Sequence, residues 1–524
     1  MKIINKCPTC NKTAEIKSES KIGNLVIINY QCGHVRARPI PNATALGLIS
    51  LDGKQPFKYQ LEGASWAIKR NARVLIADEM GVGKTLQSFL VAKSDPIEFC
   101  PVLIICKSGL KAQMCKEAYR WCGWLFQIIE NENDYILPGL QGYIISYDTL
   151  AYSEFTNKRG KVISRGIKEP EVWLEKINPR LVILDECQSV KNSESKRTQA
   201  VQKIARKVDH IIALSGTPIL NHAGEYFPIL NMIQPEKFPT KTHYIARWCD
   251  SYFSTSGVQK IGGIRDIQDF KNYTSDFIIR RTRKEVLPDL PAIDRRFRFE
   301  ELGEKVEAAY KEEFKKFQDY QYYSQDSSFK KGGELLKYLN KMRHLTGIAK
   351  IPGVVEFVEE FLSETDRKIV VFTHHLDVMN EIVGRIKAFY PNVINLSSPV
   401  NQNLVDDFWK ENNRVMIAST LAAGEGLNLQ CCSDCIMVER QWNPPKEEQA
   451  EARFLRVGQL SNHVTATYFT AIGTIDEFFS ELVEQKRSIV GSTLDGRETK
   501  WNEAEILKEL AEILAAKGGK RWGW

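Results

Sequence analysis

The chain contains 524 residues, 43% of them hydrophobic, and its formal net charge is +7. This length is expected to give two to four domains with complete cores, and the composition excludes a disordered or low-complexity protein. No apolar run approaches the length of a membrane span, and the first residues lack a secretory signal. We therefore expect a cytoplasmic protein without a membrane partner, nucleoid-associated or viral if its source is prokaryotic.

Residues 1–40 carry two close pairs of zinc-binding residue types. The pairs are Cys7 with Cys10 and Cys32 with His34. A β-like run, Leu25–Tyr30, separates them, and this arrangement predicts a tetrahedral zinc site in a small zinc-ribbon-like module. Because protein ligands fill all four positions, the zinc is expected to be structural, and the module would dock nucleic acid or a protein. Residues 41–56 are interpreted as a linker because they contain several Pro and Gly.

A strand, a glycine turn and the start of a helix are predicted between Val74 and Leu90. The turn fits a phosphate cradle in which Lys84 reaches the outer phosphates of a nucleotide and the Thr85 hydroxyl binds Mg²⁺. The generic pattern G-x-x-x-x-G-K-[ST] requires Gly where this chain has Asp78. Taken alone, the stretch leaves open an ordinary glycine turn at the start of a helix.

Strand-like and helical runs alternate along two parts of the chain, which predicts parallel sheets covered by helices. The first set of strand-like runs is Val74–Ala77, Val102–Cys106, Gly142–Ser146, Leu181–Leu184 and Ile211–Leu214, and the second is Ile369–Thr373, Val393–Leu396, Val415–Ala418, Cys435–Glu439 and Val464–Phe469. Two α/β lobes are expected at residues 57–287 and 351–492. Helical insertions are expected at 222–278 and 288–350, and a C-terminal helix with a basic and aromatic tail at 493–524.

Two acidic residues, Asp185 and Glu186, follow the fourth strand-like run of the first lobe. Paired carboxylates beside a phosphate loop suit ATP hydrolysis, with Asp185 holding Mg²⁺ and Glu186 orienting and deprotonating the attacking water. The alternative is an acidic turn between a strand and a loop. The next strand ends in a hydroxyl-rich turn, 215–218, that could link hydrolysis to a moving part.

The second lobe carries two arginines and a loop of small residues. Arg453 and Arg456 lie three positions apart in a predicted helix, so both would share one face and could neutralise charge on a transferring phosphoryl group. A pair of solvated arginines is the alternative. Upstream, the loop 419–428 is rich in small residues, which allow a phosphate backbone to approach closely.

In order and spacing, these blocks resemble helicase superfamily two, and within it the Swi/Snf-like translocases of double-stranded DNA. The blocks are Tyr59-Gln60, 78–85, 146–148, 185–186 with 191–192, 215–218, 280–286, 424–428, 442–444 and 453–459. The stretch from Ala349 to His375 further resembles the annealing-helicase branch that remodels forks. The resemblance covers roughly residues 55–485 and includes the Asp78 that departs from the generic pattern.

The resemblance implies two RecA-like lobes with ATP bound between them and DNA lying across both. It implies that Gln60 reads adenine, and that ATP also contacts Gly81, Val82, Gly83, Lys84, Thr85 and Leu86. Catalysis is assigned to Lys84, Asp185, Glu186, Arg453 and Arg456, with Mg²⁺ on Thr85 and Asp185. Coupling of hydrolysis to movement is assigned to Gln188, Ser215, Thr217, Gly424 and Gly426. Contacts with the DNA backbone are assigned to Lys107, Ser146, Tyr147, Thr373, His374, Ser419 and Thr420.

Two positions depart from the family pattern. Gln188 stands where His is commonest, so the hydrogen bond to the 215–217 turn would come from an amide that does not titrate near neutral pH. Ala452 replaces the usual Asp before Arg453 and removes a carboxylate that could orient that arginine. Arg456 is therefore the preferred arginine finger.

The leading hypothesis is an ATP-dependent motor that tracks along duplex or forked DNA, with ATP, Mg²⁺ and Zn²⁺ as cofactors. A protein partner could bind through the zinc-ribbon-like module or the C-terminal tail. One alternative keeps the enzyme but changes the substrate to RNA or single-stranded DNA. The other is a nucleotide-gated DNA-binding scaffold with little turnover, and the presence of Lys84, Asp185, Glu186 and Arg456 argues against it.

Overall fold

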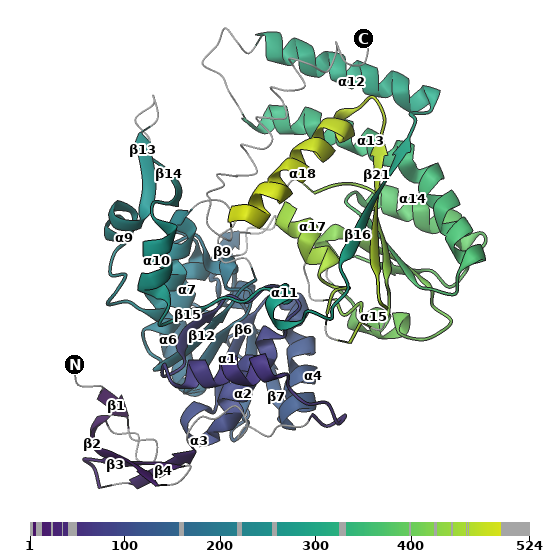
Figure 1. The fold of residues 1–524 in the computed structure, drawn as a ribbon. Coiled ribbons are helices and arrows are strands. Elements are labelled where there is room, and N and C mark those ends of the chain that lie inside the picture. The colour runs from purple at the N-terminus through teal and green to yellow at the C-terminus, as the bar shows by residue number, and fades with distance from the viewer. Residues whose placement is uncertain are drawn as a thin grey trace. The chain divides into compact units, whose positions relative to one another are not determined.

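The computed structural model describes most of the chain, which divides into two compact units (Figure 1). The described residues are 4–6, 13–22, 25–33, 35–39, 50–156, 162–216, 223–253, 259–323, 332–397, 400–423, 427–441, 444–456, 458–459 and 461–493. The first unit ends at Val286 and the second continues from Leu287.

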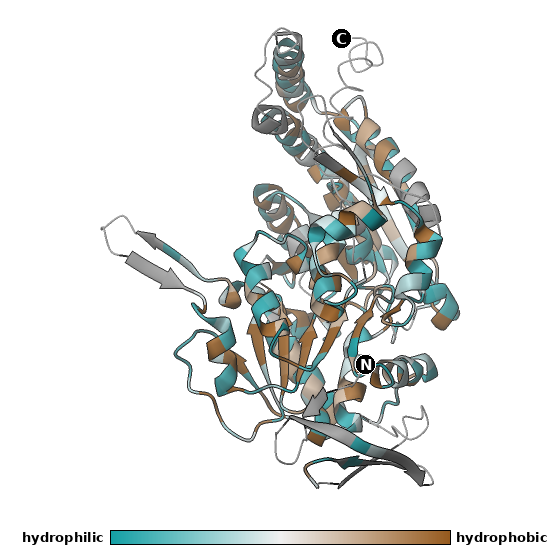
Figure 2. Ribbon diagram, turned by 90° about the vertical axis from the view of Figure 1, so that its left-hand side faces the viewer, coloured by the Kyte–Doolittle hydropathy of each residue, from teal (hydrophilic) through white to brown (hydrophobic). Residues whose placement is uncertain are grey.

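Unit 1 is built on a seven-stranded parallel sheet in the order β15-β5-β12-β11-β6-β8-β7. The strands are β5 (Arg73–Ile76), β6 (Val102–Cys106), β7 (Phe126–Ile129), β8 (Gly142–Ser146), β11 (Leu181–Leu184), β12 (His210–Leu214) and β15 (Ile278–Ile279). The five inner strands are the apolar runs predicted from the sequence. They are buried because helices cover both faces, and Figure 2 shows the strands of this sheet as hydrophobic.

Helices pack on both faces of this sheet. One core joins alternate strand residues such as Val74 and Ile76 to α1 (Lys58–Ile68), α2 (Lys84–Ser94), α3 (Pro96–Phe99) and α4 (Lys111–Cys122). The other joins Leu75 and Ala77 to α5 (Tyr147–Leu150), α6 (Pro170–Trp173), α7 (Lys196–Ala205) and α8 (Phe227–Ile233). Because successive side chains of a strand point to opposite faces, the two cores lie on opposite sides of the sheet. β9 (Ser153–Thr156) and β10 (Val162–Arg165) form a separate antiparallel pair.

The insertion predicted at 222–278 is only partly helical. Between α9 (Lys241–Trp248) and α10 (Ile267–Thr274), the strands β13 (Cys249–Phe253) and β14 (Gln259–Ile264) form an antiparallel pair. The prediction missed the pair because these short strands contain polar residues and glycines instead of an apolar run. The Trp248 ring centroid lies 5.3 Å from that of Phe270 and 4.9 Å from that of Tyr273, so the aromatic residues form the packing core here.

Unit 2 is built on a six-stranded parallel sheet in the order β16-β21-β20-β17-β19-β18. The strands are β16 (Ile293–Glu300), β17 (Ile369–Thr373), β18 (Ile394–Leu396), β19 (Val415–Ser419), β20 (Asp434–Met437) and β21 (Val464–Ala471). The helices are α12 (Glu304–Tyr323), α13 (Gly332–Glu364), α14 (Leu376–Lys387), α15 (Gln402–Phe408), α16 (Thr420–Ala423), α17 (Pro444–Glu451) and α18 (Ile475–Thr493). The prediction of two parallel-sheet α/β lobes is confirmed.

The segment 288–350, predicted as a helical insertion, begins with a strand of this sheet. β16 pairs in parallel with β21 along its whole length, from Ile293 opposite Val464 to Glu300 opposite Ala471. It is an edge strand of alternating charged and apolar residues, so it lacks the apolar run that identified the inner strands. The predicted boundary between residues 350 and 351 falls inside α13, which continues through Pro352.

The first segment of the chain forms a four-stranded antiparallel sheet of β1 (Ile4–Lys6), β2 (Thr13–Ile22), β3 (Leu25–Tyr30) and β4 (Val35–Pro39). Three predicted zinc ligands, Cys7, Cys10 and His34, lie outside the described residues, and Cys32 lies in the turn after β3. Within the described part of the chain, no group of three or more His, Cys, Asp or Glu is placed to hold a metal ion. Across the same residues, no helix combines the length and the apolar character of a membrane span.

Candidate active site

The predicted site residues of unit 1 lie at the carboxyl edge of its sheet, where parallel strands end side by side. The phosphate loop follows β5, Ser215 follows β12, and Asp185 with Glu186 follows β11. Beyond them, Lys107 follows β6 and Ser146 ends β8. Because the strand order places β12 between β5 and β11, the Ser215 turn lies between the phosphate loop and the two carboxylates.

The phosphate loop has a backbone shape that depends on its glycines. Gly81 has a φ of 88°, and Gly83, which caps α2, has a φ of 78°; residues with a Cβ rarely adopt such values. Lys84 and Thr85 open α2, so the free amides of the helix N-terminus face the loop. These groups fit a triphosphate with Mg²⁺, because the amides and Lys84 would hold phosphate oxygens and the Thr85 hydroxyl would be a metal ligand.

The Lys84 ammonium is held close to the loop. Its Nζ donates to the carbonyl oxygens of Asp78 at 3.0 Å and Glu79 at 3.1 Å. Both acceptors are neutral, so a phosphate oxygen would be a stronger partner. Beside it, a Cβ on Gly216 would lie 2.5 Å from Met80 Cγ and 3.4 Å from Lys84 Nζ, so this glycine lets the turn after β12 pack against the loop.

Gln60, predicted to read adenine, is anchored to the phosphate loop. Its Nε2 donates to the Val82 carbonyl at 3.0 Å, and its Oε1 accepts from the Phe57 amide at 3.0 Å. The Tyr59 hydroxyl donates to the same Val82 carbonyl at 2.8 Å. A Cβ on Gly83 would lie 2.3 Å from Gln60 Nε2, so this contact also requires a glycine there. The start of α1 is thereby tied to the loop.

Asp78 is fully buried and pairs with an arginine that sequence reasoning did not assign to it. Arg281 donates to the two Asp78 carboxylate oxygens from Nε at 3.1 Å and from Nη2 at 2.5 Å, and Gln87 Nε2 donates at 2.9 Å. Arg281 also donates to the Tyr59 carbonyl at 2.6 Å. A Cβ on Gly63 would lie 2.0 Å from Gln87 Oε1, so close packing of α1 is part of this arrangement. Removing one partner of such a pair costs about 3–5 kcal/mol.

Glu186 has an unusual backbone conformation. Its φ of 49° and ψ of 54° are left-handed, which costs a residue with a side chain about 1–2 kcal/mol. Gln188 Nε2 donates to Glu186 Oε2 at 2.5 Å, and Gln188 Oε1 accepts from Ser215 Oγ at 2.8 Å. One amide therefore joins the carboxylate to the turn after β12. Thr217, the other predicted coupling residue of this turn, lies outside the described residues.

Two of the three unit 1 side chains predicted to contact DNA are buried. Ser146 is 1% exposed and caps α5 by accepting from the Thr149 amide at 3.0 Å. Tyr147 is also 1% exposed, and its hydroxyl donates to the Asp185 carbonyl at 2.8 Å. Lys107 is partly exposed. The hydroxyls of Ser146 and Tyr147 therefore bond within unit 1, and contact of these two side chains with DNA stays a prediction.

The two predicted arginine fingers of unit 2 are not on a helix. α17 ends at Glu451, and Arg453 and Arg456 follow in turns, so the prediction of a shared helical face is wrong. Arg456 Nη1 donates to Asn428 Oδ1 at 2.6 Å, whereas Arg453 is 7% exposed. The remaining coupling residues of this unit lie outside the described residues: Gly424 and Gly426.

The end of α17 is fixed by Glu451. Arg295 donates to its two carboxylate oxygens from Nε at 2.8 Å and from Nη2 at 2.6 Å, and the Tyr468 hydroxyl donates at 2.6 Å. This buried carboxylate ties the end of the helix to strands β16 and β21. It positions the segment that carries Arg453 although Ala452 supplies no carboxylate.

The predicted DNA-contacting hydroxyls of unit 2 are buried as well. Thr373, Ser419 and Thr420 are 0%, 3% and 8% exposed. Thr420 Oγ1 donates to the Thr373 carbonyl at 2.8 Å and accepts from Gln441 Nε2 at 3.0 Å. Ser419 Oγ accepts from the Ala422 amide at 3.2 Å. The Thr420 hydroxyl thus joins the ends of β17 and β19, and contact of these side chains with DNA stays a prediction.

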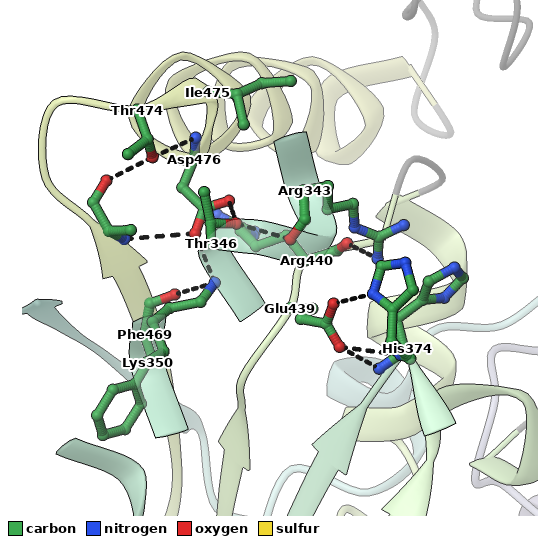
Figure 3. A network of polar contacts seen from close by, with 12 residues as sticks. Arg343, Thr346, Lys350, His374, Glu439, Arg440, Phe469, Thr474, Ile475 and Asp476 are labelled. Atoms are coloured by element: carbon green, nitrogen blue, oxygen red, sulfur yellow. Dashed lines mark hydrogen bonds and ion pairs between the residues drawn. The ribbon is translucent and has the colours of Figure 1, made fainter. Parts of the chain in front are cut away.

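The backbone after β17 is held by Glu439, as Figure 3 shows. Glu439 Oε2 accepts from the amides of His374 at 2.7 Å and His375 at 3.0 Å, and Oε1 pairs with His375 Nδ1. Burial by itself would raise the pKa of Glu439. The hydrogen bonds from His375 and the positive charge of Arg343 outweigh burial and hold that pKa at about 2.

Two further buried ion pairs stabilise the same unit. Lys350 of α13 is fully buried, and its Nζ lies 2.5 Å from Asp476 Oδ2 at the start of α18 (Figure 3). Thr346 Oγ1 donates to Asp476 Oδ1 at 2.9 Å. Arg440 donates to both carboxylate oxygens of Glu447, at 3.2 and 2.8 Å. Charged contacts therefore join the long helix α13 and the loop after β20 to the last helices.

Two family models match the chain, the SNF2-related domain at residues 59–350 and the Helicase conserved C-terminal domain at residues 353–458. The first alone covers more than half of the 524 residues. This chain belongs to the SNF2-related family. An SNF2-related chain that also carries a helicase C-terminal domain is a helicase-family ATPase core, and ATP with Mg²⁺ are the cofactors of such a core.

Individual relatives of this SNF2-related chain are longer than it is. It is 30% identical over 469 residues to the DNA annealing helicase and endonuclease ZRANB3 of Bos taurus. It is 28% identical over 446 residues to the SWI/SNF-related matrix-associated actin-dependent regulator of chromatin subfamily A-like protein 1 of Xenopus laevis. The alignments take in 87% and 83% of this chain but 42% and 43% of the relatives, so the chain spans less than half their length.

Among solved structures, the chain is similar to the Sulfolobus solfataricus SWI2/SNF2 ATPase core in complex with dsDNA. The sequence identity is 23%, the match covers 90% of this chain and 95% of that chain, and the TM-score is 0.39.

Sequence reasoning predicted the site residues of this SNF2-related chain but missed several groups that contact them. Arg281 lies 203 positions from Asp78, and Arg295 lies 156 positions from Glu451. The signal available in the sequence was Asp78, an acidic residue in the phosphate loop where the generic pattern has Gly. That signal calls for a partner but does not identify it.

Proposed function

We propose that this SNF2-related chain is an ATP-driven motor that moves along duplex or forked DNA and remodels it. The proposal rests on the contact between the Glu186 carboxylate and the turn after β12 that packs on the phosphate loop. Gln188 and Ser215 join the Glu186 carboxylate to the turn that packs on the phosphate loop, so a change at the phosphates can reach the carboxylate. The names of the relatives, a DNA annealing helicase and a chromatin regulator, support DNA as the substrate.

The proposed roles follow from the chemistry of each group. Lys84 and the loop amides bind the phosphates, and Thr85 with Asp185 holds Mg²⁺. Glu186 orients and deprotonates the attacking water. Its carboxylate can accept the proton because its partner, the Gln188 amide, is neutral. Arg456 is proposed as the main arginine finger and Arg453 as a second, each neutralising charge on the transferred phosphoryl group when the lobes close.

DNA is proposed to bind mainly through partly exposed side chains at the strand ends. The hydroxyls at the ends of β8, β17 and β19 are buried, and the amides of His374 and His375 are bonded to Glu439, so Lys107 and His374 are the predicted contacts whose side chains remain partly exposed. Contacts of this kind reach phosphate oxygens and carry no sequence information. Binding should therefore be independent of sequence and should weaken steeply as the salt concentration rises.

Zinc is proposed as a structural ion of the first segment, held by Cys7, Cys10, Cys32 and His34. The spacing of the ligand types supports this proposal. The segment and the C-terminal tail are the proposed docking sites for DNA or a protein partner. Metal analysis should find zinc in an equimolar amount, and Cys10→Ser should remove it without loss of ATP hydrolysis. A zinc-free preparation of the wild-type chain would contradict the proposal.

Steady-state ATP hydrolysis tests the proposed function. We would measure it at one fixed salt concentration without nucleic acid and then with blunt duplex DNA, forked duplex DNA, single-stranded DNA and duplex RNA. Strong stimulation by duplex or forked DNA is the expected result. Stimulation by single strands or RNA alone would keep the motor but change its substrate. An absence of hydrolysis under every condition would favour the nucleotide-gated scaffold.

A further inference from the structure

The side chain of Tyr147 is directed into unit 1. Tyr147 opens α5 directly after β8 and is 1% exposed. Its hydroxyl donates to the carbonyl oxygen of Asp185 at 2.8 Å. Burial raises the pKa of Tyr147 well above its ordinary value, so the hydroxyl stays protonated and can donate at any working pH.

This hydrogen bond connects two strands that are not neighbours. β6 lies between β8 and β11 in the sheet, so the tyrosine reaches past the end of β6 to its acceptor. The acceptor belongs to the peptide group that joins Asp185 to Glu186. Rotation of that peptide group is what would allow Glu186 to leave its left-handed conformation, with a φ of 49°. The hydroxyl therefore opposes relaxation of a strained residue, and strained residues persist only where their surroundings hold them.

The conformation of Glu186 decides where its carboxylate lies. In the held conformation Glu186 Oε2 accepts from Gln188 Nε2 at 2.5 Å, and Gln188 Oε1 accepts from Ser215 Oγ at 2.8 Å. A relaxed peptide group would move the carboxylate away from this chain of contacts. The Tyr147 hydroxyl can thus set the position of the carboxylate through the backbone.

Asp148, the residue after Tyr147, faces outward. Asp148 has a side chain that is 63% exposed, and its Oδ1 lies 2.5 Å from Arg197 Nη2. Ser108 Oγ lies 3.5 Å from Asp148 Oδ2. A ligand can therefore reach the polar groups of Asp148 and its contacts. It cannot reach the Tyr147 side chain, which is buried.

We propose that Tyr147 is a positioning residue for ATP hydrolysis and not a DNA contact: its hydroxyl holds the Asp185–Glu186 peptide group so that the Glu186 carboxylate faces Gln188. The inference rests on the proposed hydrolytic role of Asp185 and Glu186. It gives the Tyr of the 146–148 block a role inside the hydrolysis site, where the family resemblance had implied contact with the DNA backbone.

Two matched variants test the proposal, Tyr147→Phe and Tyr143→Phe. Tyr143 lies on β8, the strand that leads into Tyr147; it is 3% exposed, and its hydroxyl donates to the Leu137 carbonyl at 2.6 Å. Each variant therefore loses one buried hydroxyl bonded to a main-chain carbonyl, and only one of these carbonyls belongs to the site. The first measurement is amide hydrogen exchange of residues 184–191 in the nucleotide-free chain, which needs no catalysis. Exchange should be faster in Tyr147→Phe and unchanged in Tyr143→Phe.

The second measurement is kinetic, with and without duplex DNA. Tyr147→Phe should lower kcat about tenfold in both conditions, a change of ~1.4 kcal/mol in the barrier, with KM for ATP and duplex affinity unchanged. Equal exchange and equal kcat in the two variants would overturn the proposal. So would weaker duplex binding, or a loss confined to the DNA-stimulated rate, because Tyr147 would then act on DNA. A wild-type chain that duplex DNA does not stimulate would overturn the proposed function alone, since exchange and the unstimulated kcat still decide the role of Tyr147.

Discussion

The carboxyl edges of the two sheets are stabilised by different mixtures of contacts. In unit 1, neutral hydroxyl and amide groups join the ends of β8, β11 and β12, as Tyr147 does with the Asp185 carbonyl and Ser215 does with Gln188, and the Asp78–Arg281 ion pair holds the phosphate loop. In unit 2, ion pairs with a buried carboxylate hold the corresponding segments. They are Lys350–Asp476, Arg440–Glu447 and Arg295–Glu451, and the Glu439 carboxylate also accepts from the amides of His374 and His375.

The difference predicts which property each edge controls. A neutral hydrogen bond contributes about 1 kcal/mol, so losing one shifts geometry more than it threatens folding. Removing one member of a buried ion pair costs about 3–5 kcal/mol, because the other charge is left in the interior. Substitutions of the neutral groups at the unit 1 edge should therefore act mainly on turnover, and substitutions of the buried ion pairs mainly on stability.

The largest effect is expected from Glu186→Gln. The amide cannot accept the proton of the attacking water, so kcat should fall by about 10²–10⁴-fold while ATP and DNA still bind. Glu194→Gln, an exposed residue farther along the same loop, is the control and should keep the wild-type rate. Steady-state hydrolysis and equilibrium nucleotide binding check both variants. Wild-type turnover by Glu186→Gln would remove Glu186 from the mechanism.

Breaking one buried ion pair in each unit distinguishes effects on stability from effects on ATP binding. Lys350→Met leaves the Asp476 charge buried and Arg281→Met leaves that of Asp78, so each should cost about 3–5 kcal/mol. Arg281→Met should also raise KM for ATP, because Asp78 leads into the phosphate loop, whereas folded Lys350→Met should keep the wild-type KM. Calorimetric unfolding and initial-rate kinetics measure the two properties. An equal change of KM in both variants would contradict the predicted difference between the two edges.

A pH dependence is expected from Glu439. Its pKa of about 2 in the folded chain lies below the ordinary value near 4.5, so its contribution is present in full above that value and is lost as the pH falls toward 2. A shift of this size is on the order of 3 kcal/mol. Glu439→Gln should therefore be less stable than wild type at pH 7, and the difference should narrow below about pH 4.5. Urea unfolding at a series of pH values checks this, and a constant difference would contradict it.

The smallest effect is expected from Ser215→Ala, which removes the donor to Gln188. One neutral hydrogen bond of about 1 kcal/mol corresponds to a fall in kcat of roughly fivefold, with little change in stability. Ser94→Ala removes a hydroxyl that donates to the Val91 carbonyl at 2.6 Å, away from the sheet edge, and is the matched control. Identical rates for the two variants would mean that the Gln188 contact does not support turnover.

The sequence was sufficient for the parts of the fold that follow from continuous apolar runs. The inner strands of both sheets were predicted because burial on both faces requires such runs, whereas β16 was missed because an edge strand alternates charged and apolar residues. Within the site, spacing identified Lys84, Asp185 and Glu186. It could not identify the Asp78–Arg281 pair, which joins residues 203 positions apart. It also gave no direction for Tyr147, since a motif does not say whether a side chain faces solvent or core.

Strand displacement from a DNA triplex tests the central claim most directly. A third strand bound to duplex DNA is removed by a protein that travels along the duplex, and no strand separation of the duplex is needed. The wild-type chain with ATP should release the third strand. The Glu186→Gln variant should bind the duplex but leave the third strand in place. Duplex-stimulated hydrolysis by the wild-type chain without any release would contradict the motor, because ATP would then be consumed without movement along DNA.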